Sequence, residues 1–224
     1  SEAYIGVLMD DLVTKENHEP YRMMTSRAEY RLLLRQDNAD LRLTKKGYEI
    51  GLISKERYDW VCKKEQMIKE EIDRVAKVHE GANKEVQALL ESYGSIPLNT
   101  GVTLTELIRR PELDYDKLAP IDHERPELPE EVREQVNILI KYDGYISRQI
   151  KQVESFKKLE KKKIPEGFDY DEVPSLRIEA RQKLKLYSPT SIGQASRISG
   201  VSPADVSVLL VYMEQMNHHG EHHS

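Results

Sequence analysis

Apolar residues recur every three or four positions through most of this chain, a spacing that predicts α-helices rather than strands. The clearest stripe lies between positions 54 and 80, with Lys and Glu at most other positions, and consists of Tyr58, Val61, Ile68, Ile72, Val75 and Val78. Ser54 precedes the stripe and can cap its helix. Similar patterns cover positions 83–93 and 175–186. The sequence therefore predicts an all-α protein.

The longest predicted helix runs from about position 130 to 162 and would be roughly 50 Å long at about 1.5 Å per residue. Pro129 suits its first turn, and Pro165 and Gly167 end it. Its buried stripe would be Val132, Val136, Leu139, Tyr142, Ile146, Ile150, Val153 and Phe156. We expect a multi-helix bundle with this long central helix as its spine.

Shorter signals surround this helix. Thr103 and Glu106 form a capping-box pattern, and Pro111 ends the helix that follows it. Residues 111–129 are rich in Pro and acidic residues, and we expect them to form a linker at the surface. Ser-Pro pairs at positions 188–189 and 202–203 predict the starts of a final helical pair.

The composition limits which ligands, cross-links and cellular compartment are expected for this chain. Charged residues make up 33% of the 224 residues, and the net charge is −5, so only local patches would bind a polyanion. The single cysteine, Cys62, excludes an internal disulfide, and its apolar neighbours predict that it is buried. No apolar run approaches the roughly 18 residues of a membrane span, and no signal peptide is evident, so we expect a cytoplasmic protein.

One segment, positions 19–44, is dense in arginine. On a helix, the spacing of four between Arg27, Arg31 and Arg35 would place three guanidinium groups on one face, where they could bind phosphates. The alternative is that the arginines pair with acidic residues of the same segment, namely Glu29, Asp37 and Asp40. We expect this segment to be helical as far as about Arg35.

A second basic region lies at positions 141–163, where eight basic and three acidic residues give a net charge of +5. Its basic residues suit RNA phosphates, but they equally suit a solvated helix end.

Four blocks of the chain, in order, carry a family resemblance: positions 3–12, 19–44, 141–149 and 188–205. The second block contains Glu19-Pro20-Tyr21-Arg22, Thr25-Ser26-Arg27-Ala28-Glu29-Tyr30-Arg31-Leu32 and Asp37-Asn38-Ala39-Asp40-Leu41-Arg42-Leu43-Thr44. On these blocks the chain resembles the C-terminal third of the tRNA-modifying flavoprotein family called GidA or MnmG.

The resemblance implies an enzyme that acts with the GTPase MnmE. Together they modify C5 of the wobble uridine of tRNA with a carboxymethylaminomethyl-type group, using FAD, NADH and methylene-tetrahydrofolate. The intact enzyme is expected to be a homodimer. The glycine-rich fingerprint that seats the FAD pyrophosphate does not occur here, so we expect this chain alone to hold no FAD and to be inactive.

The resemblance and the charge pattern together give two sets of candidate residues and no catalytic or metal-ligating ones. For tRNA binding we expect Arg22, Arg27, Arg31, Arg35, Arg42, Arg148 and Lys151. The terminal helices are more apolar than one core-facing stripe requires and are slightly acidic, which favours a protein partner. For partner binding we expect Gln194, Arg197, Ser207, Leu210 and Tyr212.

These observations predict that the chain has three parts. Residues 1–45 would be the end of the cofactor domain, beginning with a short mixed strip packed on an absent part of that domain, together with the arginine-rich connecting segment. Residues 46–216 would be the helical domain, and residues 217–224 a disordered His-rich tail. Two alternatives stay open: a helical protein–protein scaffold without RNA contact, and a helix-turn-helix DNA binder built on Ser196, Gly200 and Val206. The scarcity of basic residues after position 188 argues against the second.

Overall fold

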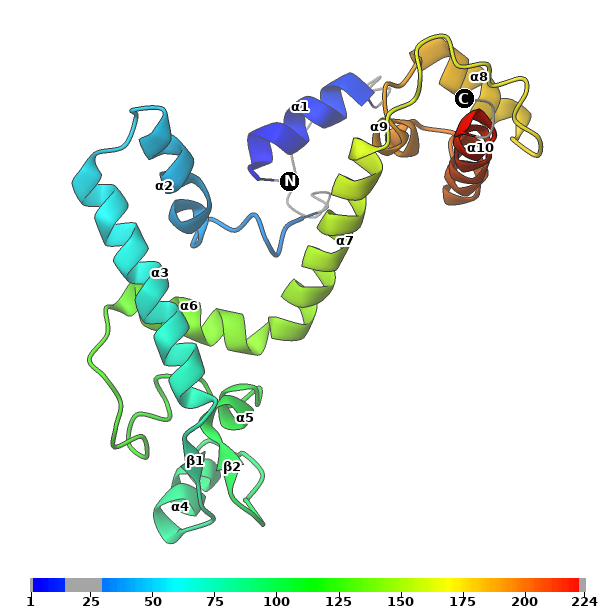
Figure 1. Cartoon of the computed structure of the whole chain (residues 1–224). Coiled ribbons are helices and arrows are strands. Elements are labelled where there is room, and N and C mark those ends of the chain that lie inside the picture. The colour runs from blue at the N-terminus through cyan, green and yellow to red at the C-terminus, as the bar shows by residue number, and fades with distance from the viewer. Residues whose placement is uncertain (1, 15–29, 222–224) are drawn as a thin grey trace. The chain divides into compact units, whose positions relative to one another are not determined.

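The structure is a computed structural model that describes residues 2–14 and 30–221 (Figure 1). The chain divides into two compact units. We call Leu32–Arg148 the central unit, and Ala3–Arg31 together with Gln149–Ser224 the terminal unit. Helices dominate both units, which confirms the all-α expectation.

The central unit contains one two-stranded sheet among its helices. The strands are antiparallel, with His79 opposite Thr103 and Glu80 opposite Val102. In chain order, its elements are α2 (Ala39–Glu49), α3 (Lys55–Val75), β1 (His79–Glu80), α4 (Lys84–Ser92), β2 (Val102–Thr103), α5 (Leu104–Ile108) and α6 (Glu130–Lys141).

Side-chain caps set the starts of α3 and α5 as the sequence predicts, whereas the start expected at Ser188-Pro189 is wrong, because Ser188 ends the helix Ile178–Tyr187 and the next helix begins after Ser191. The Ser54 hydroxyl accepts a hydrogen bond from the Arg57 N–H at 3.3 Å and begins α3. Thr103 and Glu106 form the predicted capping box at the start of α5. Each cap satisfies donors that a helix start otherwise leaves unpaired.

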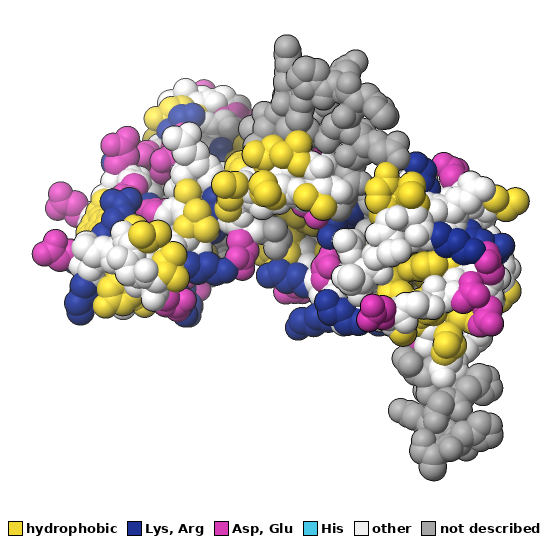
Figure 2. Space-filling view, turned by 90° about the horizontal axis from the view of Figure 1, so that it is seen from above, with side chains coloured by type: hydrophobic (Ala, Val, Ile, Leu, Met, Phe, Trp, Pro, Cys, Tyr) yellow, Lys and Arg dark blue, Asp and Glu magenta, His cyan; other side chains and the backbone are white. Residues whose placement is uncertain are grey.

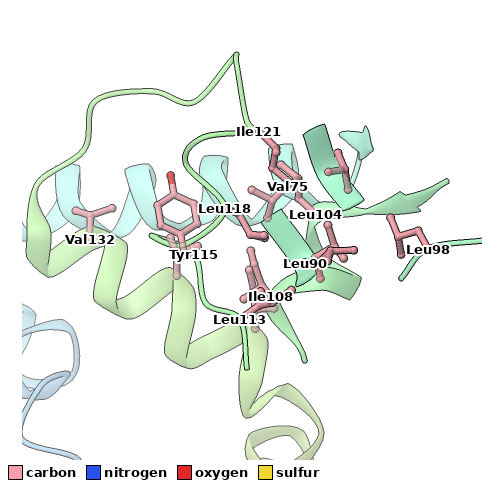
Figure 3. Close-up of a cluster of buried hydrophobic side chains, with 14 of the residues drawn as sticks. Val75, Leu90, Leu98, Leu104, Ile108, Leu113, Tyr115, Leu118, Ile121 and Val132 are labelled. Atoms are coloured by element: carbon pink, nitrogen blue, oxygen red, sulfur yellow. The ribbon is translucent and has the colours of Figure 1, made fainter. Parts of the chain in front are cut away.

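The core of the central unit includes the segment expected to be a surface linker (Figure 3). Residues 111–129 contain no helix or strand, but four of their side chains are at most 2% exposed: Leu113, Tyr115, Leu118 and Ile121. These residues pack against side chains of α3 and α6, including Val75 and Val132. The segment is therefore part of the core instead of wrapping the surface.

The long helix expected over positions 130–162 is two helices, α6 and α7 (Asp143–Lys161), separated by Tyr142. Tyr142 has φ −103° and ψ 10°, outside helical geometry. The backbone bonds nevertheless continue, because its N–H donates to the Ile138 carbonyl and its carbonyl accepts from Ile146. The Arg109 guanidinium binds the Asp143 carboxylate at 3.0 Å directly after the break.

The terminal unit begins with a helix where the sequence analysis expected a mixed strip. Its elements are α1 (Tyr4–Thr14), most of α7, α8 (Ile178–Tyr187), α9 (Ile192–Arg197) and α10 (Pro203–Glu221). Its core is formed by Val173, Ala180, Leu184, Ile192, Ala195 and Leu209, all of them fully buried.

The surface differs from expectation at three residues: Tyr142 and Ile150, expected on the buried stripe of the long helix, are 48% and 42% exposed, and the third is Cys62. Cys62 is exposed on α3, close to Trp60, because the buried stripe of this helix runs through Val61 instead. Over the described part of the face shown in Figure 2, basic, acidic and hydrophobic side chains are interspersed. No helix among the described residues has the length and apolar character that a membrane crossing needs.

Candidate functional site

The arginine-dense segment enters the described structure at Tyr30, so Arg22 and Arg27 lie outside the described residues. From Tyr30 to Asn38 the chain forms turns and bends, and α2 begins only at Ala39. The expected helix through Arg35 is therefore wrong for its described part. Arg31 is exposed and Arg35 is half-buried, and helical spacing does not relate them.

Arg35 is engaged inside the central unit. Its Nε and Nη2 donate to the two carboxylate oxygens of Asp37, both at 3.0 Å, and its Nη1 donates to the Leu32 carbonyl at 2.7 Å. Gln135 of α6, 1% exposed, accepts from Arg35 and donates to Asp37 at 2.6 Å. Burial alone would raise the pKa of Asp37, but these bonds hold it below its usual value. Arg35 therefore pairs with an acidic residue of its own segment, Asp37, as in the second interpretation of the sequence, instead of presenting its guanidinium group to phosphates.

Arg42 is also bonded locally. Its Nε donates to the Asn38 side chain at 2.9 Å, and its Nη2 donates to the Arg35 carbonyl at 3.0 Å. Both bonds lie within the loop and first turn that lead into α2. Arg42 therefore fixes the backbone of this segment.

A buried lysine that the sequence analysis did not single out ties the same segment to the bundle. Lys64 of α3 is 2% exposed, and its Nζ donates to Asp40 at 2.9 Å and to Glu131 at 2.8 Å. Burial alone would lower the pKa of Lys64, but the two carboxylates raise it. The burial of Lys64 could have been predicted from its position in the sequence, because it lies three residues after Val61 and four before Ile68 on the buried stripe of α3.

A second buried network holds residues 115–122 against α3. Glu71, only 3% exposed, accepts from the Tyr115 hydroxyl at 2.8 Å and from Arg74, which also binds Asp122. Burial and the bond to Glu71 raise the pKa of Tyr115. Every member has a partner within the network, so its role is structural.

Basic residues with no such partners lie along α7. Arg148, Lys151 and Lys158 are exposed, and no carboxylate among the described residues lies within 4.0 Å of their charged groups. Spacings of three and seven residues keep them on one side of the helix, away from the buried Ile146 and Val153. This row, Arg148–Lys151–Lys158, is a local concentration of unneutralised positive charge.

The five residues expected to bind a partner fall into two groups. Gln194 accepts from the Thr190 N–H at 2.7 Å, and Arg197 binds Asp10 at 3.0 Å and also Glu160, so both stabilise the terminal unit. Leu210 packs against the core of that unit.

The other two, Ser207 and Tyr212, line a common pocket of about 330 Å³ on α10. Val206 and Leu209 of the same helix are buried. The face that a DNA-reading helix would need is therefore partly committed to the core.

Two family models match the chain. One is described as the tRNA modifying enzyme MnmG/GidA C-terminal helical domain and matches residues 55–150, and the other, its C-terminal helical bundle, matches residues 152–224. The chain belongs to the MnmG/GidA family. The boundary between the MnmG/GidA models falls within a few residues of the boundary between the two structural units, which lies after Arg148.

Named MnmG relatives are close in sequence. The tRNA uridine 5-carboxymethylaminomethyl modification enzyme MnmG of Lachnoclostridium phytofermentans is 68% identical over 216 residues, which are 96% of this chain and 34% of that protein. The MnmG of Caldicellulosiruptor saccharolyticus is 61% identical over 96% of this chain and 34% of its own length. The chain thus spans about a third of the length of these relatives.

A solved GidA structure has the same fold. The form II crystal of Aquifex aeolicus GidA matches with a TM-score of 0.72 and 42% identity, over 94% of this chain and 33% of that one.

The residues of this chain that the structure describes do not form the glycine-rich FAD-binding unit that the family resemblance implies for the whole enzyme. That unit is a parallel strand–helix–strand arrangement with a glycine turn at the helix start. The described strands, β1 and β2, are two residues each and antiparallel. In the described ranges no group of three or more His, Cys, Asp or Glu side chains is placed to hold a metal ion.

Proposed function

We propose that this chain is the tRNA- and partner-binding portion of an enzyme that modifies C5 of the wobble uridine of tRNA, acting with the GTPase MnmE. Family membership and the names of the relatives support tRNA as the substrate. FAD, NADH and methylene-tetrahydrofolate would act in the remaining two-thirds of a longer cytoplasmic, homodimeric enzyme. This chain alone would bind no flavin and would be inactive.

The observation that carries the RNA part of the proposal is the row Arg148–Lys151–Lys158 on α7. Exposed cations without carboxylate partners retain their full attraction for phosphate, and binding to RNA releases counterions. Such contacts position an RNA without reading its sequence. Arg31 is exposed and suits the same role, as Arg22 and Arg27 would. Arg35 and Arg42 would contribute by fixing the segment that carries Arg31.

The test compares tRNA binding of two charge-matched triple variants in a salt series. In the first, Arg148, Lys151 and Lys158 are changed to alanine. In the control, three exposed lysines in or just after α3 that form no ion pair with a described residue are changed to alanine: Lys63, Lys69 and Lys77. We expect the first to reduce the slope of log affinity against log salt by about 0.7–0.9 per lost contact, and the control to leave it unchanged. Equal effects of the two variants would contradict the proposed RNA surface.

The partner part of the proposal concerns α9 and α10. Ser207 and Tyr212 line an open pocket, and Leu210, beside them on α10, packs against the core of the unit. We propose that MnmE binds this surface, with Gln194 and Arg197 holding α9 in place. A helical scaffold without RNA contact is the second candidate, since the pocket favours a protein. It would be preferred if the chain bound MnmE but no tRNA at low salt.

The proposed absence of flavin has its own test. The purified chain should show no flavin absorbance near the visible maximum of that cofactor, even after incubation with FAD and gel filtration. Near-stoichiometric flavin in the protein peak would contradict this part of the proposal.

A further inference from the structure

The pocket on α10 has one apolar helical face as its floor. Ser207, Val208, Val211 and Tyr212 line it, at spacings that place them on the same side of α10. Leu209, between them in sequence, is fully buried, so the helix is anchored from its opposite side. Val211 remains 55% exposed, which is unusual for an aliphatic residue flanked by core positions. The apolar floor is therefore accessible from solvent.

The opposite wall comes from the chain before α8. Pro174 and Ser175 line the pocket, and Ser175 has φ +65°. That left-handed conformation is unfavourable for a residue other than glycine and persists where the surroundings impose it. The wall is thus held in a defined shape next to α10.

The rim beside Tyr212 is acidic. The Tyr212 hydroxyl lies 3.5 Å from a carboxylate oxygen of Glu172. Burial and the charges of Glu172 and Asp169 raise the pKa of Tyr212. Asp171 is neutralised by Lys185 and Arg181, whereas no Lys or Arg nitrogen in the described part of the chain lies within 4.0 Å of the carboxylates of Glu172 and Asp169. This rim repels phosphate and attracts a cation.

We infer that this pocket binds one apolar side chain of a partner protein segment that carries a basic residue next to that side chain. The volume, about 330 Å³, is at the small end for ligand sites and suits a single anchor side chain. The basic neighbour would pair with Glu172 at the rim. The inference rests on the proposed function, because it specifies the chemistry of the partner at the α10 surface.

The test selects peptides from a random displayed library on the immobilised full chain, with counter-selection on the Val211→Glu variant. The recovered peptides are then synthesised and titrated against variants by calorimetry. Glu172→Gln removes the rim charge beside the Tyr212 hydroxyl and leaves that of Asp169. Ile178→Glu is the matched control, because Ile178 is 74% exposed on α8 of the same unit and does not line the pocket. Melting temperatures confirm that each variant is folded.

We expect enriched peptides to place an apolar residue beside Lys or Arg. Their affinity should fall by about tenfold or more on Val211→Glu, by about threefold on Glu172→Gln, and by less than about twofold on Ile178→Glu. The inference is overturned if no peptide distinguishes the parent chain from Val211→Glu, or if acidic peptides are enriched. It is also overturned if Val211→Glu weakens tRNA binding as much as peptide binding, since the pocket would then be part of an RNA surface.

MnmE binding, measured in parallel, separates this inference from the proposed function. Peptides that meet the expectation while MnmE fails to bind would leave the pocket assignment standing and remove MnmE as the partner. MnmE that binds the parent and Val211→Glu chains equally, with no selective peptide, would retain MnmE as the partner but remove both the pocket and the proposed α10 contact surface.

Discussion

Asp205 shows how much one buried carboxylate contributes to the terminal unit. It is 2% exposed, accepts from the Ser202 N–H and hydroxyl at 2.8 and 2.7 Å, and binds Arg177. The bonds from Arg177 and Ser202 outweigh burial and hold the pKa of Asp205 well below its usual value. Asp205 thus caps α10 and ties it to the residue before α8.

We predict that Asp205→Asn lowers the free energy of unfolding by about 2 kcal/mol near neutral pH, because a charged cap and an ion pair are lost. The folded pKa is depressed, so the contribution is present above the unfolded pKa of about 3.9 and is lost as pH falls through the folded value. Denaturant unfolding as a function of pH checks this. The difference between parent and variant should shrink below about pH 4, and a difference that is constant with pH would contradict it.

We predict that alanine substitutions of Arg31 and Arg35 have different effects, the first on tRNA binding and the second on stability. Arg35→Ala removes bonds to Asp37, Gln135 and a carbonyl, and should cost about 1.5–3 kcal/mol of stability. Arg31→Ala should change stability by less than about 0.5 kcal/mol, because the side chain is exposed, while weakening tRNA binding. Thermal melts and tRNA anisotropy measure the two effects. Reversal of this pattern would show that Arg31 is the structural residue of the two.

The spacing of residues along the chain predicted which positions are buried better than it predicted which side chains pair with one another. The stripe of α3 correctly identified Val61, Ile68 and Val75, but the charged residues Lys64 and Glu71 occupy the same buried face. Periodicity treats a charge as solvent-facing, whereas these two charges are satisfied by groups far away in sequence: Lys64 by Asp40, and Glu71 in part by the Tyr115 hydroxyl. Spacing alone cannot reveal such pairings. For the same reason, the ion-pair alternative for Arg35 could be stated from the sequence but not chosen.

At the scale of elements, the close approach of α9 to the end of α7 depends on a glycine. A Cβ at Gly193 would lie 2.5 Å from the Glu160 carboxylate, which binds Ser191 and Arg197. The side chain of Glu160 would have to leave these partners. Small residues permit such contacts, and larger ones force a shift.

We predict that Gly193→Ala destabilises the terminal unit by about 1–3 kcal/mol. Gly144→Ala is the matched control: nothing lies within 4 Å of the added Cβ, and the residue is in α7. It should stabilise by up to about 1 kcal/mol, since alanine favours a helix over glycine. Denaturant midpoints measure both. Equal shifts of the two variants in the same direction would contradict the close-approach explanation.

The starts of α3 and α5 were predictable, whereas the start of α9 and the break at Tyr142 were not. Caps at Ser54 and Thr103 act through neighbours three residues away, so the sequence contains both partners. At Tyr142 the apolar period continues through the break, and the ion pair after it joins Asp143 to Arg109, which is remote in sequence. Likewise, the Pro- and acid-rich composition of residues 111–129 indicated non-helical chain correctly. It did not indicate that the apolar residues of this segment enter the core.

For the whole molecule, the two units predict two unfolding transitions. Each has its own buried cluster, and each corresponds to a separate family model. Domains with separate cores can unfold as separate cooperative units. We predict that calorimetry resolves two transitions and that Gly193→Ala lowers only one of them. A single transition that shifts as a whole would show that the units fold as one.

Trp60 and Cys62 are the only tryptophan and the only cysteine of the chain, and both lie on α3 of the central unit. Intrinsic tryptophan fluorescence and any maleimide dye will therefore observe that unit and be blind to the other. A denaturation curve followed optically would assign normal stability to a chain whose α9–α10 region had already melted. The same asymmetry is an experimental advantage: a dye on Cys62 marks one unit covalently without mutation, while the α10 surface stays unmodified for binding.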